Sequence, residues 1–136
     1  PTIVIQALTD DVVRLGHLAP IRDFTYVADT VEGFIKAAEA PAAVGRTLNL
    51  GTGRGVGIGQ LVTLIGEQLA TPLTVEQDGQ RTRPDESEVE RLMADASAAK
   101  SVLGWEPVVS LEEGLSKTIA WIREHLDAYR PGVYAV

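Results

Sequence analysis

Residues 47–79, TLNLGTGRGVGIGQLVTLIGEQLATPLTVEQDG, constrain the fold of this 136-residue chain more than any other stretch. A short β-type segment at 46–50 leads into glycines at every second position from 51 to 59. A helix and a second β-type segment, at 72–77, follow. The apolar residues of the helix stand at helical spacing: Ile58, Leu61, Val62, Ile65 and Leu69. This order of strand, turn, helix and strand predicts an α/β fold with parallel pairing.

The glycine run raises the question of a dinucleotide site. Such a site needs glycines at i, i+2 and i+5, so that the backbone can approach a pyrophosphate at a helix N-terminus. Because the glycines alternate, the third place falls on Val56, Ile58 or Gln60. We therefore favour a flexible strand-to-helix turn. A small NAD-binding protein that uses residues 51–59 is kept as the less favoured alternative.

Further elements are predicted before this stretch. The pattern of apolar residues predicts a helix at 1–8 and strands at 12–16 and 22–27. Asp29 then begins a helix that Pro41 stops, and Glu32 stands three residues after Asp29, which is the spacing of a capping box.

The region after the second β-type segment is polar. Residues 78–90 predict a surface loop, with a helical turn in 87–93. The chain as a whole has few strands for so many amphipathic helices. Either its sheet is unusually small or part of the sheet belongs elsewhere.

Two more helices are predicted near the C-terminus. Ser97 can cap a short helix that Gly104 ends in a left-handed turn. Ser110 and Glu113 have the spacing of a second capping box, followed by apolar residues at helical spacing.

Composition excludes several classes of protein. The chain has no cysteine, which excludes a disulfide framework and thiolate zinc sites and fits a cytoplasmic protein. It has no apolar run long enough to cross a bilayer. A net charge of −7 argues against non-specific nucleic-acid binding but leaves room for an anionic small ligand held by one or two arginines. His17 and His125 lack metal-ligand spacing, so no metal site is predicted.

Several motifs, in order, resemble one known family. They are RDFTYVADTVEGFIKAAEA from Arg22, GRTLNLGTG from Gly45, RTRPDESEVERLMADAS from Arg81 and AAKSVLGWEPVVSLEEGLSKTIAWIREH from Ala98. Together they are similar to the extended short-chain dehydrogenase/reductases, and in particular to nucleotide-sugar epimerases and 4,6-dehydratases. The resemblance covers nearly the whole chain, although Ala98 stands where this family usually has lysine.

The resemblance implies a fold that is incomplete. The family's N-terminal Rossmann half carries its NAD fingerprint, its catalytic Ser or Thr and its Tyr-x-x-x-Lys pair, and none of these is found here. We therefore expect a C-terminal portion with a small sheet and several amphipathic helices, forming one substrate-binding domain over 1–136. Residues 28–50 would normally pack on the missing sheet. NAD would belong to the intact enzyme, and this chain alone is expected to be inactive.

The resemblance also implies roles for two arginines. Arg22 corresponds to an arginine that contacts the diphosphate of a nucleotide sugar, and Arg83 to a second one, with Arg81 as the alternative if the register shifts. A guanidinium suits this task because its planar fork bonds two oxygens and stays charged. The competing interpretation for Arg22 is a surface ion pair with nearby acids.

The remaining candidate substrate contacts are two acids and two apolar residues. Asp85 and Glu88 are candidates for binding the ribose hydroxyls; the competing interpretation is that both belong to a solvated charged loop. Val13 and Leu15 correspond to a strand that passes beside the base; the competing interpretation is a half-buried strand without such a contact. Trp105 and Trp121 are expected to be packing residues.

The function implied is that of the part of an NAD-dependent epimerase or 4,6-dehydratase that binds a nucleotide-diphosphate sugar, without catalytic residues of its own. The alternative is a stand-alone, non-catalytic binding or assembly module derived from that family. Because the helix after Asp29 and the segment 46–50 would lack their usual partner, we also expect a homodimer through this exposed apolar surface.

Overall fold

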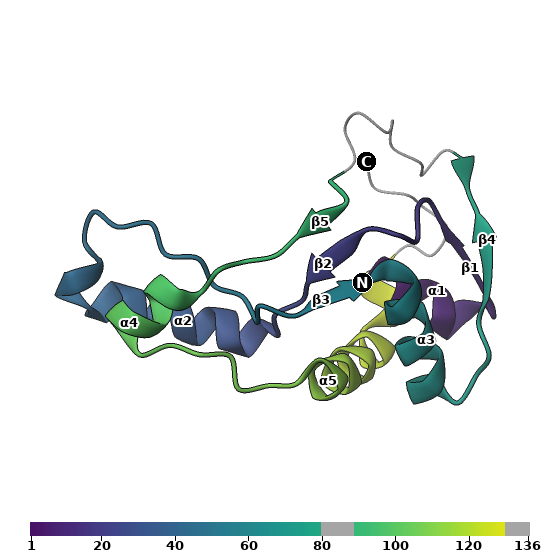
Figure 1. Ribbon diagram of the computed structural model, residues 1–136. Helices are drawn as coiled ribbons and strands as arrows, with labels where there is room; N and C mark the ends of the chain where they lie inside the picture. The colour runs from purple at the N-terminus through teal and green to yellow at the C-terminus, as the bar shows by residue number, and fades with distance from the viewer. Residues whose placement is uncertain (80–88, 130–136) are drawn as a thin grey trace. The chain divides into compact units, whose positions relative to one another are not determined.

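The computed structural model describes residues 1–79 and 89–129. Figure 1 shows its elements along the chain. They are α1 (Thr2–Thr9), β1 (Val12–Leu15), β2 (Ile21–Asp23), α2 (Val27–Glu39), η1 (Pro41–Ala43), β3 (Gly55–Gly57), α3 (Ile58–Leu69), β4 (Thr74–Gln77), β5 (Arg91–Leu92), α4 (Ser97–Leu103), α5 (Leu111–Glu124) and η4 (Leu126–Ala128). The chain forms two compact units: residues 1–20, 57–89 and 115–136 belong to the first, and residues 21–56 and 90–114 to the second.

In the first unit, β1 and β4 form a parallel two-stranded sheet in which Val13 pairs with Val75. Val13, Leu15 and Val62 are the buried centre of its core. Side chains from α1, α3 and β4 pack around them, namely Ile3, Ala7, Ile58, Leu73 and Val75. The helix predicted at 1–8, the strand at 12–16 and the helix–strand pair of residues 58–77 are confirmed, with small shifts at their ends.

At the edge of β1, a side chain forms hydrogen bonds with the main chain of the strand. The amide of Gln6 in α1 accepts the N–H of Arg14 at 2.8 Å and donates to its carbonyl oxygen at 3.2 Å. One glutamine thus bonds to both main-chain polar groups of Arg14, as a neighbouring strand would.

Helix α5 begins where its cap was predicted. The hydroxyl of Ser110 accepts the N–H of Glu113 at 3.1 Å. Ile119 and Ile122 on α5 are buried. Trp121 is 52% exposed and so lies outside the core, but it is a packing residue as expected, since its ring stacks on His125 with centroids 4.3 Å apart.

In the second unit, β2 lies between β3 and β5. The pairing of β2 with β5 is parallel and sets Ile21 opposite Arg91 and Arg22 opposite Leu92. The strand predicted at 22–27 is shorter than expected because α2 already begins at Val27. The helical turn predicted in 87–93 is wrong for Arg91 and Leu92, which pair with β2, and residues 87–88 lie outside the described part.

The predicted capping box at Asp29 is also wrong. Helix α2 starts two residues earlier, with Tyr26 at the cap position and no side-chain cap. Asp29 is instead buried, and its two carboxylate oxygens accept the N–H groups of Val108 and Val109 at 3.2 and 3.1 Å. Glu32 forms an ion pair with Lys36 at 3.5 Å. The carboxylate therefore serves a distant loop rather than its own helix.

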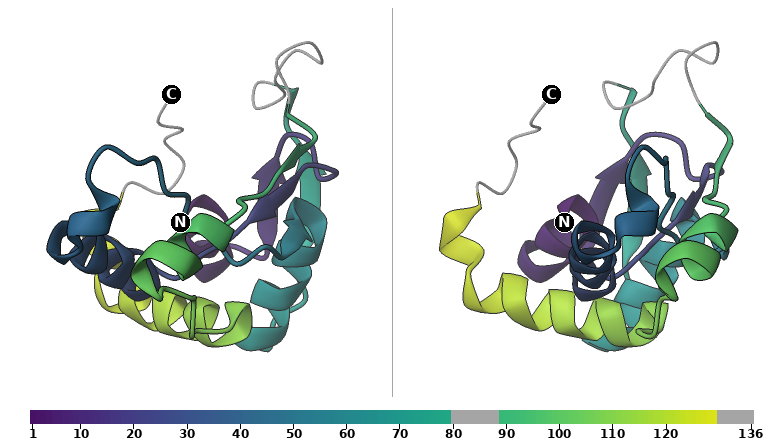
Figure 2. Two further views of the ribbon diagram at one scale, coloured as in Figure 1. Left: turned by 60° about the vertical axis from the view of Figure 1, so that its left-hand side comes forward. Right: turned by 90° about the vertical axis from the view of Figure 1, so that its left-hand side faces the viewer.

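Helix α4 lies beside α2 in the second unit (Figure 2). Its predicted cap, Ser97, is wrong: Ala96 holds the cap position, and the N–H of Ser97 donates to the carboxylate of Asp95 at 2.9 Å. The predicted end is confirmed, since Gly104 adopts a left-handed conformation with φ of 62°.

Residues 46–50 do not form the predicted strand. Among the described residues no strand pairs with them, and a strand exists only with a partner. Leu48 and Leu50 are half-buried, whereas Arg46 and Asn49 are exposed. Helix α2 carries exposed apolar side chains, with Phe34 66% and Ile35 48% exposed.

Candidate functional site

The candidate site is built on β2 of the second unit. Arg22 is half-buried there, and its Nη1 donates to the carbonyl oxygen of Ile21 at 2.9 Å. The N–H of Ile21 donates to the carbonyl oxygen of Glu90 at 2.7 Å, immediately before β5 begins. The chain that leaves residues 80–88 is therefore hydrogen-bonded to the strand that carries Arg22.

The other predicted ligands of a diphosphate and ribose lie outside the described residues. These are Arg83, its alternative Arg81, and the acids Asp85 and Glu88. That Arg22 and Arg83 meet at one diphosphate stays a prediction. The anchoring of Glu90 beside Arg22 is compatible with it, because Glu90 lies only two positions after Glu88 in the sequence.

Asp23, the residue after Arg22, is the most heavily bonded side chain of this region. One oxygen accepts the N–H of Thr52 at 3.0 Å and the hydroxyl of Thr52. The other accepts the N–H of Gly53 at 2.9 Å and the N–H of Ala94 at 3.3 Å. Partial burial acts to raise the pKa of Asp23, but these hydrogen bonds from Thr52, Gly53 and Ala94 outweigh it and hold the pKa below its ordinary value.

The glycines around this carboxylate are needed for close packing. A Cβ on Gly51 would lie 2.7 Å from Oδ2 of Asp23, and one on Gly55 would lie 2.6 Å from Ile21. Gly53 has a φ of 69°, which side-chain-bearing residues rarely adopt. The turn at 51–55 is thus shaped to approach β2.

The same contacts weigh against an NAD site in the glycine run. The N–H groups of Thr52 and Gly53 both donate to Asp23. A pyrophosphate approaching these two donors would meet a carboxylate instead. The favoured interpretation of the run as a strand-to-helix turn agrees with this geometry.

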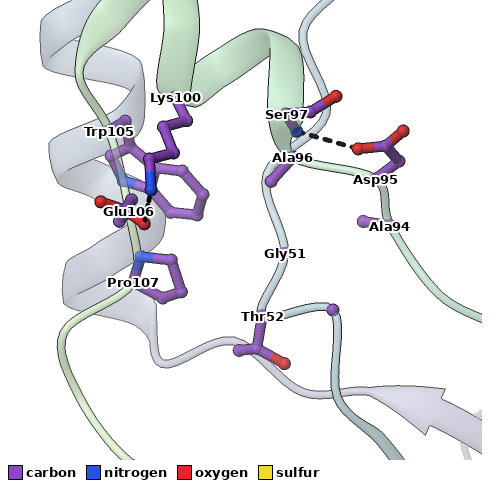
Figure 3. Close-up of a pocket in the computed structure, with 11 residues that line it drawn as sticks. Gly51, Thr52, Ala94, Asp95, Ala96, Ser97, Lys100, Trp105, Glu106 and Pro107 are labelled. Atoms are coloured by element: carbon purple, nitrogen blue, oxygen red, sulfur yellow. Dashed lines mark hydrogen bonds and ion pairs between the residues drawn. The ribbon is translucent and has the colours of Figure 1, made fainter.

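A cavity of about 260 Å³ lies beside the turn (Figure 3). Its wall includes Thr52, Trp105 and the charged residues of α4 and its flanks. These charged side chains bind other groups of the wall: Lys100 forms an ion pair with Glu106 at 2.7 Å, and Asp95 accepts the N–H of Ser97. The cavity offers a ligand no convergent set of polar groups, and we assign it none.

Val13 and Leu15 are core residues of the first unit. Both side chains are buried, and the carbonyl oxygen of Leu15 already accepts the N–H of Asp78 at 2.8 Å. Contact between β1 and a nucleotide base stays a prediction. It would have to use main-chain groups of β1 other than the carbonyl of Leu15, because the two side chains are buried.

Asp23 and Asp29 are the two residues whose importance the sequence did not reveal. Both belong to the motif that begins at Arg22, and the local sequence pattern predicts only a helix cap for Asp29. Their partners lie 29 to 80 residues away in the sequence. A signal was present in Asp23, since an acidic residue is uncommon inside a strand. Within the described residues, no group of three or more metal-binding side chains is found.

Comparison with known proteins identifies the family. Residues 2–118 match the family model described as GDP-mannose 4,6 dehydratase. The chain belongs to this family. The resemblance to extended short-chain dehydrogenase/reductases, and the α/β fold of part of such an enzyme, are thereby confirmed.

Individual relatives agree with this assignment. The chain is 33% identical over 108 residues to a UDP-glucose 4-epimerase of Mycolicibacterium smegmatis. The aligned region covers 79% of this chain and 33% of that protein. It resembles the crystal structure of the Thermotoga maritima UDP-glucose 4-epimerase with UDP-glucose, at 32% identity and a TM-score of 0.79, over 91% of this chain and 38% of that one.

A third relative was solved with a substrate and a cofactor. This is the UDP-glucuronic acid 4-epimerase of Bacillus cereus in complex with UDP-glucuronic acid and NAD, at 25% identity and a TM-score of 0.82, over 91% of this chain and 39% of that one. The chain spans about a third of the length of the curated relatives it matches. None of the described helices has the length and apolar character that crossing a membrane requires.

Proposed function

We propose that this chain supplies the nucleotide-diphosphate-sugar binding part of an NAD-dependent epimerase or 4,6-dehydratase and has no catalytic residue of its own. The observation that carries the proposal is the pairing of β2 with β5. It holds Arg22 next to the point where the chain leaves residues 80–88, which contain Arg83. Two relatives of this fold were solved with UDP-linked sugars, which fits the same ligand class.

The diphosphate of a nucleotide sugar is a ligand that two arginines can bind together. A diphosphate carries two negative charges on neighbouring groups, and each guanidinium can bond two of its oxygens. Asp85 and Glu88 would accept hydrogen bonds from the ribose hydroxyls. In the intact enzyme, NAD would accept a hydride from the sugar and return it. The role left to this chain is to hold and orient the substrate.

The test is calorimetric titration of the chain with UDP-glucose in the absence of NAD. We expect binding that needs the diphosphate, so that uridine fails to compete. Arg22→Ala should weaken it by about 10- to 100-fold, the usual worth of a charge-assisted hydrogen bond. Arg123→Ala is the matched control, since Arg123 is an exposed arginine of α5 in the other unit. Equal effects of the two changes would contradict the proposal.

Two further measurements test the expected inactivity of the chain and the NAD-binding alternative. The chain with NAD and UDP-glucose should show no turnover. Titration with NAD alone should show no binding; NAD binding that Gly53→Val abolishes would instead support the NAD-binding alternative. UDP-glucose binding without NAD is also what the stand-alone binding module requires, so both versions of the proposal share the site.

We also propose that the chain associates with a second copy through an apolar face made of Val27, Val31, Phe34 and Ile35 on α2 and Val44 after it. These side chains are 48 to 84% exposed. The neighbouring residues 46–50 have no pairing strand among the described residues. Two copies related by a twofold axis could bury both features at once, because a segment can pair with itself across such an axis.

A further inference from the structure

Asp23 joins three segments that are far apart in the sequence. Its carboxylate belongs to β2, and its four donors come from the turn at Thr52 and Gly53 and from Ala94, two residues after β5. Both oxygens are thus occupied by groups of the protein. Asp23 is therefore placed to organise its surroundings rather than to contact a ligand.

Strand geometry links this carboxylate to Arg22. Successive side chains of a strand point to opposite faces, so Ile21 and Asp23 share one face and Arg22 lies on the other. The close approach of Gly55 to Ile21 and of Gly51 to Asp23 agrees with this arrangement. Fixing Asp23 on one face therefore fixes the direction in which Arg22 leaves the other.

The bond to Ala94 extends the effect of Asp23 to the chain after β5. Arg91 and Leu92 pair with β2, and the N–H of Ala94 is held by Asp23 at 3.3 Å. Together with the bond from Ile21 to Glu90, this ties both ends of β5 to the strand of Arg22. The chain that follows residues 80–88 is thereby attached at two points.

We propose that Asp23 is a positioning residue for Arg22 in the diphosphate site: it holds β2, the turn at 52–53 and both ends of β5 in one register, and so fixes the direction in which the guanidinium of Arg22 meets the ligand. This inference rests on the proposed function. Its charge matters because a carboxylate accepts at both oxygens. An asparagine, which is nearly the same size, must turn an NH₂ group toward N–H donors in either orientation.

Asp23→Asn tests the proposal. We expect the dissociation constant for UDP-glucose to rise about 10-fold, the loss expected when partly buried N–H donors lose their acceptor. Asp95→Asn is the matched control, because Asp95 also accepts a main-chain N–H, from Ser97, but does so on an exposed loop of the same unit. It should change the dissociation constant by less than about twofold.

A double-mutant cycle with Arg22→Ala separates positioning from a general loss of structure. If Asp23 acts through Arg22, then Asp23→Asn should have a much smaller effect once Arg22 is removed. Equal effects in both backgrounds would overturn the inference. Amide hydrogen exchange provides a readout without ligand: Asp23→Asn should accelerate exchange at Gly53 and Ala94 and leave the amides of α3 unchanged.

Thr52 supplies a milder variant in case Asp23→Asn does not fold. Thr52→Ser keeps the hydroxyl donor to Asp23 and should bind UDP-glucose as the wild type does. Thr52→Val removes it and should weaken binding by a few fold. A wild-type chain that does not bind UDP-glucose overturns the proposed function. A wild-type chain that binds, with Asp23→Asn and Thr52→Val unchanged, overturns this inference alone.

Discussion

The indole Nε1 of Trp105 donates a 2.8 Å hydrogen bond to the main-chain carbonyl oxygen of Asp29, 76 residues earlier in the chain. Both residues are buried, at 1 and 4% exposure. The carboxylate of the same aspartate binds the N–H groups of Val108 and Val109. One residue of α2 therefore holds the whole segment from Trp105 to Val109.

Asp29→Ala should lower the free energy of unfolding by about 2–6 kcal/mol. It leaves two main-chain N–H groups without their acceptor in a partly buried place, and each such loss costs about 1–3 kcal/mol. Urea denaturation followed by circular dichroism measures the change. Glu32→Gln on the same helix is the control, because its ion pair with Lys36 is solvent-exposed and contributes at most about 0.5 kcal/mol. Similar losses for the two variants would show that Asp29 is not the anchor.

The contribution of Asp23 to stability should depend on pH. Its pKa is lower in the folded chain than the ordinary value of 3.8, so protonation favours the unfolded state. The stabilisation should be fully present above about pH 5 and lost as the pH falls through the folded-state pKa. The difference in unfolding free energy between the wild type and Asp23→Asn, measured from pH 7 to pH 3, should therefore shrink toward the acid end. The other carboxylates titrate in both proteins, so their contributions cancel in this difference. A difference in unfolding free energy that stays constant from pH 7 to pH 3 would contradict the prediction.

The alternating glycines should not be equivalent. Gly51→Ala should cost about 1–3 kcal/mol, because its Cβ would press against both Asp23 and Ala94 in a packed region. Gly57→Ala should be neutral within about 0.5 kcal/mol, since no neighbouring atom lies within 4 Å of the added carbon and its φ is −71°. Thermal unfolding of the two variants makes the comparison. If Gly57→Ala is as harmful as Gly51→Ala, the run serves some purpose other than close packing.

Local signals in the sequence predicted the features that depend on local physics. The apolar spacing of Ile58 to Leu69 located α3, Gly104 located the end of α4, and Ser110 located the start of α5. Periodicity and capping act over a few residues, so they can be recognised without the fold. The pattern of apolar residues also placed Arg22 on a strand, which the structure bears out.

The failures concern interactions across long sequence distances. Asp29 has the spacing of a cap, but its carboxylate binds residues about 80 positions later. Residues 46–50 have the composition of a strand but no strand to pair with among the described residues. In both cases a local pattern was correct as a preference and was overruled by which groups come together in space. The four hydrogen bonds to the carboxylate of Asp23 are another such case, because their donors come from two segments that are distant in the sequence.

Self-association should depend on the exposed face of α2. Phe34 is 66% and Val31 48% exposed on one helix, and burying such side chains against a second copy releases roughly 25 cal/mol per Å² of apolar surface. Sedimentation velocity at tens of micromolar, roughly the range in which such surfaces associate, should show a dimer. Phe34→Glu should convert it to a monomer without loss of helicity, because a carboxylate cannot be buried there without a partner. Trp121→Glu, at another exposed aromatic residue, should leave the dimer intact. A wild-type chain that stays monomeric at this concentration, or a dimer that survives Phe34→Glu, would place the contact elsewhere or exclude it.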